Sequence, residues 1–224
     1  MNKKILVIAA HPDDEILGAG ATLINLVKAG NNVSCLILGQ GAMARDAAKT
    51  KNIDSLKKDA LESGKIIGFD QIYFSDLPDN QFDKLPLLEI VKEVEKYFEI
   101  VGPDIIYTHY ENDLNVDHQL TAQAVMTAAR PCNPDAPSEI YAFETLSSTE
   151  WQSKVSNIFN PSIYINIEDS IDLKIKAMKA YTSEIREYPH SRSIEGIKIL
   201  AQYRGLEAGL KYAEAFILVR KIEK

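Results

Sequence analysis

Short apolar runs alternate with segments of helical periodicity along most of the chain, and this alternation limits the choice of fold more than any other feature. The runs at 5–9 and 33–38 are continuous and partly β-branched, as expected for strands buried on both faces. Between them, residues 16–29 place apolar side chains at helical spacing and end at Gly30-Asn31. This stretch predicts a strand, a helix and a second parallel strand joined by a right-handed crossover.

The same alternation continues toward the C-terminus. Further helices are predicted at 54–67, 87–100, 117–130, 170–185 and 193–208, and further strands at 71–74, 104–108, 162–167 and 213–219, the last as an addition to the sheet edge. Such a pattern is typical of an α/β, Rossmann-like three-layer fold with a mostly parallel sheet and helices on both faces. No linker, repeat or low-complexity tract interrupts the sequence, so we expect residues 1–224 to form a single domain.

Charge and cysteine content exclude several classes of function. The formal net charge is −7 and no basic stripe is present, which argues against a nucleic-acid partner. Cys35 and Cys132 lie far apart, Cys35 within an apolar run, so no disulfide scaffold is indicated. The apolar run near the N-terminus is too short for a membrane span and does not suit a signal peptide. We therefore expect a cytoplasmic protein without membrane insertion.

Two groups of polar residues follow predicted strands of the sheet. The first strand leads into Ala10-His11-Pro12-Asp13-Asp14-Glu15, and the strand at 104–108 leads into His109 and a loop that ends in Asp117-His118. Ligands of parallel sheets bind beyond the carboxyl ends of the strands. We therefore expect both groups at the same edge of the sheet. Asp76 and Asp79, which follow the strand at 71–74, are weaker candidates for a contact with the substrate.

The first group has the composition of a metal site. A helix N-terminus favours one or two carboxylates, but it does not explain His11. Zinc takes imidazole and carboxylate ligands, and His11 and Asp14 can reach one ion, with His118 as the third ligand. A bound ion lowers the pKa of water and generates a nucleophile, and Asp13 is adjacent and free to accept its proton. Iron(II) accepts the same ligands, which leaves the metal open between Zn2+ and Fe2+.

These residues resemble the PIG-L/LmbE-like deacetylases. The resemblance extends over nearly the whole chain, through Thr108-His109, the segment 113–118, the segment 189–193 and the segments 203–205 and 212–216. It implies a zinc enzyme that removes the acetyl group from an N-acetylated amino sugar or sugar conjugate. By that resemblance His11, Asp14 and His118 match the zinc ligands, and Asp13 matches the general base.

One position departs from the family pattern. Better-known members carry His-x-x-His in the second motif, whereas this chain has Asn115 at the first position. His190 is our preferred replacement as the electrophile or acid, with Asp117 orienting it, although a loop histidine that caps the following helix fits the same position. His109 is the alternative, as a supporting group near the substrate or the ligands.

Substrate contacts are the least defined part of this hypothesis. Asn115 can donate a hydrogen bond to an oxyanion, and the resemblance suggests a substrate contact for Arg45, for which a solvated charge beside Asp46 is an equal alternative. The small-molecule substrate is expected to be an N-acyl amino sugar, and a homo-oligomer stays open. Gly18-Ala19-Gly20 lacks the third glycine of a dinucleotide fingerprint, which argues against a nucleotide cofactor.

Two alternatives are retained for the activity. One is a zinc hydrolase of another N-acyl group, such as a formamido group. The other is a catalytically impaired binding homologue, because Asn115 replaces the usual histidine. The intact Asp13 argues against the second alternative.

Overall fold

The sheet has seven strands in the computed structural model, which describes residues 2–41, 53–133, 136–155 and 157–223. The strands are β1 (Lys4–Ala9), β2 (Asn32–Gly39), β3 (Gln71–Leu77), β4 (Ile105–His109), β5 (Glu139–Phe143), β6 (Ile163–Asn166) and β7 (Ala213–Lys221). Their order across the sheet is β3-β2-β1-β4-β5-β7-β6. Strands β1 to β5 pair in parallel, and β7 runs antiparallel to both of its neighbours.

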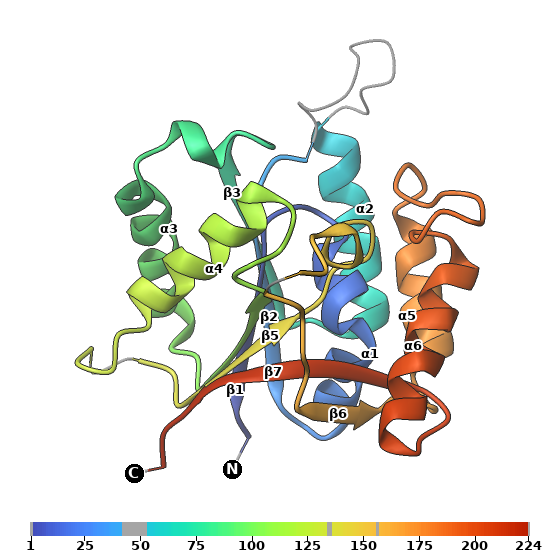
Figure 1. Cartoon of the computed structure of the whole chain (residues 1–224). Helices are drawn as coiled ribbons and strands as arrows, with labels where there is room; N and C mark the ends of the chain where they lie inside the picture. Colours follow the sequence, from blue (N-terminus) through green and yellow to red (C-terminus); the bar gives the residue numbers. More distant parts are fainter. Residues whose placement is uncertain (1, 42–52, 134–135, 156, 224) are drawn as a thin grey trace.

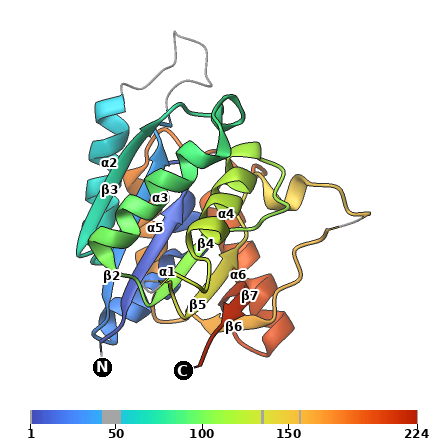
Figure 2. The same cartoon turned by 90° about the vertical axis from the view of Figure 1, so that its left-hand side faces the viewer.

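Helices cover both faces of this sheet, which makes three layers. The α-helices among the described residues are α1 (Asp14–Lys28), α2 (Ile53–Ile67), α3 (Leu87–Val101), α4 (Val116–Ala128), α5 (Ile171–Ala180) and α6 (Ile194–Ala208). Figure 1 shows α3 and α4 on one side of the sheet and α1, α2, α5 and α6 on the other, and Figure 2 shows α3 and α4 from the front. Each side has its own cluster of buried apolar residues. The α/β three-layer prediction is confirmed.

Strand β1 lies where the order of connection reverses, with β2 on one side and β4 on the other. The chain leaves β1 through α1 on one face, and it enters β4 from α3 on the opposite face. Crevices at the carboxyl ends of such strands are the usual ligand sites of open α/β sheets. The segments after β1 and β4 therefore face a common crevice.

Close packing holds α1 against the sheet beneath this crevice. A Cβ atom on Gly18 would lie 2.2 Å from the ring of Phe143, so only glycine permits this approach of α1 to β5. All β1 residues after Lys4 are fully buried. The turn after β1 is thus carried by a rigid strand on one side and a tightly packed helix on the other.

Three elements differ from the sequence-based prediction. Strand β5, at 139–143, was not predicted, because its five residues follow a proline-containing irregular segment and give little periodic signal. Strand β7 does not lie at the sheet edge, since β6 pairs beyond it. Helix α5 ends at Ala180 instead of continuing to 185, because Tyr181 turns into the core and is fully buried.

Candidate active site

His11, Asp14 and His118 come together at the carboxyl edge of the sheet. His11 lies in the turn after β1, Asp14 is the first residue of α1, and His118 lies in the first turn of α4. One ligand atom from each of the three lies within 4.8 Å of the others. Asp14 and His118 are buried, and the side chain of His11 is 12% exposed. The geometry thus unites the three residues that the sequence proposed as metal ligands.

The hydrogen bonds of His118 leave one ring nitrogen facing this cluster. Its Nδ1 lies 3.1 Å from Oδ1 of the buried Asp113, which fixes the proton on Nδ1. Asp113 is itself held by the hydroxyls of Ser148 and Thr149 and by the Asn115 amide. Nε2 of His118 then carries a lone pair, and this buried atom has no hydrogen-bond partner among the described residues.

The ring of His11 is oriented in the same manner. Its Nε2 lies 3.0 Å from Asp117 Oδ2 and 3.4 Å from Asp79 Oδ1, while its Nδ1 lies 3.3 Å from Asp14 Oδ2. Carboxylates behind metal-bound imidazoles commonly fix the tautomer and raise the basicity of the ligand. Burial opposes a positive charge on His11, but Asp117 and Asp14 outweigh it and raise its pKa to about 10.

This donor set fits a divalent cation. Asp14 Oδ2 lies 3.2 Å from His118 Nε2, and its second oxygen, Oδ1, is buried without a hydrogen-bond partner among the described residues. Burial raises the pKa of Asp14, but His118 and His11 reverse the effect and hold it well below its usual value. One ionised carboxylate and two imidazoles match the three-ligand set of catalytic zinc sites, in which the ion displaces the proton from the coordinating ring nitrogen.

Asp13 lies beside this set with its backbone in an unusual conformation. Its φ of 99° falls in the left-handed region, which costs a residue other than glycine about 1–3 kcal/mol. Its carboxylate is buried and accepts a hydrogen bond of 3.0 Å from Arg192 Nη1, which also lies 3.3 Å from Glu184. Burial raises the pKa of Asp13, Arg192 acts in the opposite direction, and Asp14 adds to the rise. A raised pKa suits a group that must accept and return a proton near neutral pH.

A small pocket of about 80 Å³ is lined by one candidate ligand, His11, and by the candidate base, Asp13. Its rim carries Asn80, Asn115, Glu184 and Arg192. Asn115 caps α4, where its Oδ1 accepts a hydrogen bond of 2.8 Å from the Asp117 amide, and its Nδ2 donates to Asn80. The pocket therefore combines one candidate ligand, the candidate base and several hydrogen-bonding side chains.

Asp117 and His109 both lie next to the candidate ligands. Asp117 contacts His11 and accepts a hydrogen bond from the Phe82 amide, so the prediction that it orients His190 is wrong. His109 is buried behind the cluster, stacked on His118 with ring centroids 3.9 Å apart, and its Nε2 accepts a hydrogen bond from the Ala10 amide. Burial and the neighbouring His118 hold the pKa of His109 well below its usual value. Arg45 lies outside the described residues.

His190 lies in the loop before α6, next to Arg192. Its Nδ1 accepts a hydrogen bond of 3.1 Å from the Arg192 amide, so the neutral ring carries its proton on Nε2. Its ring packs edge-to-face on Trp151, whose side chain is half exposed, with the ring centroids 5.5 Å apart. Burial, Arg186 and Arg192 lower the pKa of His190. His190 therefore accepts a hydrogen bond from the backbone of Arg192, whose side chain in turn donates to Asp13, the candidate base.

Three residues of the site had a weak role or none in the sequence analysis: Asp79, Asp113 and Glu184. Asp79 follows the carboxyl end of β3, so the rule that located the metal ligands also points to it. Asp113 entered only through the family resemblance, and nothing local shows that its carboxylate turns back to His118. Glu184 fell within a predicted helix and gave no signal.

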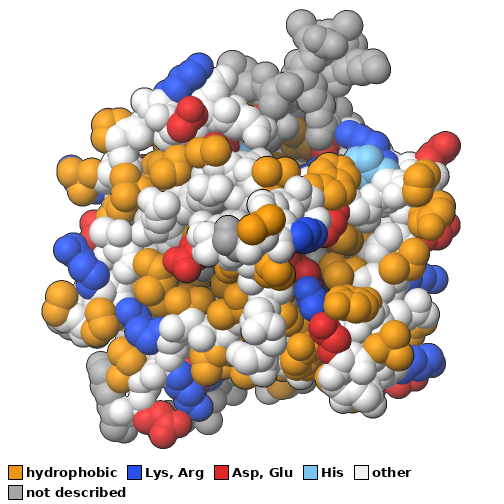
Figure 3. Space-filling view, in the orientation of Figure 1, with side chains coloured by type: hydrophobic (Ala, Val, Ile, Leu, Met, Phe, Trp, Pro, Cys, Tyr) orange, Lys and Arg blue, Asp and Glu red, His pale blue; other side chains and the backbone are white. Residues whose placement is uncertain are grey.

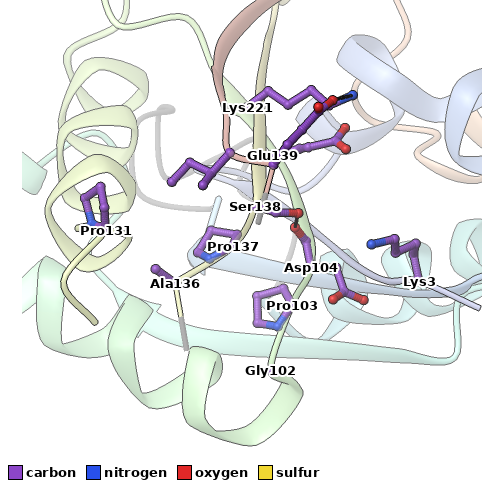
Figure 4. A pocket seen from close by; sticks show the side chains of 12 residues that line it. Lys3, Gly102, Pro103, Asp104, Pro131, Ala136, Pro137, Ser138, Glu139 and Lys221 are labelled. Carbon is purple, nitrogen blue, oxygen red and sulfur yellow. Dashed lines mark hydrogen bonds and ion pairs between the residues drawn. The ribbon is translucent and has the colours of Figure 1, made fainter. Parts of the chain in front are cut away.

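Two other hollows formed by the described residues lack this chemistry. A pocket of about 610 Å³ lies at the opposite edge of the sheet, where Figure 4 shows Lys3, Asp104, Glu139 and Lys221. Its charged groups have local partners: Asp104 accepts from the Lys4 amide, and Lys221 pairs with Glu223. A groove of about 390 Å³ between α4 and β7 is mainly apolar, and Figure 3 shows apolar side chains gathered over this part of the surface. Within the described ranges, the one group with metal-ligand spacing is His11, Asp14 and His118.

A family model connects this geometry with known proteins. The model described as PIG-L, GlcNAc-PI de-N-acetylase, matches residues 6–129, which include all three candidate ligands and Asp13. The chain belongs to the PIG-L family. The matched region extends from β1 to the end of α4, so it contains the turn after β1 and the start of α4, which carry the candidate ligands.

Individual PIG-L relatives extend the match beyond that region. The uncharacterized deacetylase YaiS of Escherichia coli is 29% identical over 81% of this chain and 91% of its own length. Diacetylchitobiose deacetylase of Thermococcus kodakarensis is 25% identical over 97% of this chain and 83% of its own length. The crystal structure of the conserved protein TT1542 from Thermus thermophilus superposes with a TM-score of 0.80 at 23% identity, over 99% and 97% of the two chains, which shows the shared fold.

The structure also bears on membrane association. In the part of the chain that it describes, every helix is too short or too polar to cross a bilayer.

Proposed function

We propose that this chain is a metal-dependent N-deacetylase that hydrolyses the acetamido group of an amino sugar or sugar conjugate, with residues 1–224 as one catalytic domain. The observation that carries the proposal is the convergence of His11, Asp14 and His118 within 4.8 Å, with the carboxylate of Asp13 beside them. Membership of the PIG-L family and the names of the relatives support the choice of reaction.

The residues of the pocket account for the steps of amide hydrolysis. A divalent ion at this site would polarise the acyl carbonyl and lower the pKa of a water to about 7. Asp13 would take the proton of the attacking water and return it to the departing amine. Arg192 holds the carboxylate of Asp13 in place at 3.0 Å and lines the same pocket. Zn2+ is the expected ion, and Fe2+ suits the same ligands.

The position of the usual motif histidine is filled here by Asn115, whose side-chain amide caps α4 and lines the pocket. We propose His190 as the group that donates a proton or hydrogen bond in its stead, because its Nε2 carries a proton and its loop supplies Arg192. His109 is a poor donor toward the substrate, since it is buried and its Nε2 is occupied by the Ala10 amide. His190→Gln is expected to lower turnover by at least tenfold with the metal content unchanged. Near-normal turnover in this variant would reject the assignment.

Substrate identity is tested with a panel of N-acyl sugars. The metal-loaded protein is incubated with N-acetylglucosamine, diacetylchitobiose, N-acetylglucosaminyl malate and N-formylglucosamine, and acetate, formate and free amine are quantified by NMR. Equal amounts of acetate and amine from at least one acetylated compound are expected. Formate release alone would move the assignment to a formamido hydrolase. Metal-loaded protein inert on every compound would favour a binding homologue.

A further inference from the structure

The backbone of Asp13 is held by groups that the proposed mechanism does not use. Its amide donates a hydrogen bond of 3.1 Å to Oε2 of Glu15, two residues later. Its carbonyl accepts from the amides of Ile16 and Leu17, which begin α1. Both backbone polar groups of Asp13 are therefore fixed, one by the helix and one by the side chain of Glu15.

Glu15 is in turn held from a distant part of the chain. Its Oε1 accepts a hydrogen bond of 2.5 Å from the hydroxyl of Tyr181, which lies 166 positions later, after α5. Glu15 is 1% exposed and Tyr181 is fully buried, so both side chains are surrounded by packed atoms. The carboxylate of Glu15 thus bridges the turn that carries Asp13 and the core beneath α5.

The hydrogen bonds of Glu15 hold the Asp13 backbone in a conformation that is unfavourable for a residue other than glycine. A residue other than glycine leaves the left-handed region unless its surroundings hold it there, and Asp13 has a φ of 99°. If the Asp13 peptide relaxed, its carboxylate would move relative to Asp14, the next residue in the chain and a candidate ligand. Displacements of about 1 Å at a reacting group can reduce turnover by about a hundredfold.

We propose that Glu15 and Tyr181 are positioning residues that lock the backbone of Asp13 and thereby aim its carboxylate at the reacting centre. The role of Asp13 as the base rests on the proposed function, whereas the lock on its backbone stands on the hydrogen bonds alone. Arg192 completes the arrangement from the other side by holding the carboxylate itself. The base is thus fixed at the backbone by Glu15 and Tyr181 and at the side chain by the loop before α6.

The test removes one hydroxyl and compares it with a matched control. Tyr181→Phe deletes the bond to Glu15. Tyr97→Phe deletes the hydroxyl of a buried residue in α3, which donates to the Phe74 carbonyl in β3, away from the pocket. In the metal-loaded protein, Tyr181→Phe is expected to lower kcat at least tenfold at unchanged KM and metal content, while Tyr97→Phe leaves kcat within twofold of the unmodified chain.

Substitutions at Glu15 separate positioning from a general loss of packing. Glu15→Gln keeps an oxygen that can accept from the Asp13 amide, while Glu15→Met has similar volume and no such acceptor. The glutamine variant is therefore expected to retain at least tenfold more kcat than the methionine variant at equal metal content. Equal kcat values in the two variants would overturn the proposal.

A second readout does not depend on turnover. Hydrogen exchange at the Asp13 amide, measured by NMR in the metal-loaded protein, is expected to accelerate at least tenfold in Tyr181→Phe and further in Glu15→Met, but not in Tyr97→Phe. Unchanged exchange in both variants would overturn the lock. If the unmodified chain hydrolyses no N-acyl sugar, the proposed function fails, and the exchange measurement still decides the backbone claim.

Discussion

Asp113→Asn is a direct test of how the protein orients His118, one of its candidate metal ligands. Asp113 Oδ1 accepts hydrogen bonds from His118 Nδ1 at 3.1 Å and from the Asn115 amide at 2.9 Å. Asparagine has nearly the same volume and retains one acceptor oxygen, so the substitution removes the charge and leaves the packing intact. The remaining ligand nitrogen of His118 should then become less basic and its ring less firmly held.

The size of the effect follows from this single lost charge. Removing the group behind a metal-bound histidine typically weakens metal binding by about 10- to 100-fold, or about 1.4–2.8 kcal/mol. Because Asp113→Asn keeps the hydrogen bond, we expect the lower end, about tenfold, and we expect about a hundredfold for Asp113→Ala. Zinc affinity is measured by competition with a chromogenic chelator at pH 7.5.

A control substitution isolates the cause. Asp104 also accepts a hydrogen bond from a backbone amide, that of Lys4, but lies at the opposite edge of the sheet. Asp104→Asn should leave the zinc affinity unchanged. If Asp113→Asn binds zinc as tightly as the unmodified chain, while His118→Ala loses the metal, the proposed orientation of His118 is refuted.

Three further predictions follow from other contacts. Asp13→Asn should reduce kcat by about 10²- to 10⁴-fold with one ion per chain retained, and a smaller loss would exclude Asp13 as the base. In the metal-free protein the pKa of His11 is raised to about 10, so protonated His11 stabilises the folded state fully below pH 6.5, and this contribution is lost as the pH rises toward 10. The free energy of unfolding, measured with urea, should therefore fall by up to about 1.4 kcal/mol per pH unit in this range. His11→Ala should flatten this decline. Lys174→Met should destabilise the fold by about 3–5 kcal/mol, because it strands the buried Glu214, whereas Lys176→Met on the exposed face of α5 should cost less than 1 kcal/mol in the same assay.

Local sequence patterns predict both the layers of the fold and the candidate metal ligands, because both depend on where the strands begin and end. The apolar runs of β1 and β4 mark strands whose carboxyl ends share one edge, so the residues that follow them must meet. His11, Asp14 and His118 could be identified in this way before any contact was known. The strand order beyond β4 could not be predicted, because pairing between β5, β7 and β6 depends on contacts between distant segments.

The groups that orient the ligands and the base are less visible in the sequence. Asp113 and Asp117 stand close together, yet the first turns to His118 and the second to His11. The side chain of Asp113 takes its orientation from hydrogen bonds with the hydroxyls of Ser148 and Thr149, which are distant in the sequence. Tyr181 fell inside the helix predicted at 170–185, and nothing in its neighbourhood indicates that its hydroxyl reaches the first turn of α1.

The central claim is that one divalent ion, held by His11, Asp14 and His118, is required for amide hydrolysis. Metal-free protein is titrated with Zn2+ while bound metal and released acetate are measured in the same samples. We predict that acetate release rises in proportion to bound zinc and levels off at one ion per chain, and that His118→Ala abolishes both. Acetate release by the metal-free protein, or full activity of His118→Ala, would contradict the account.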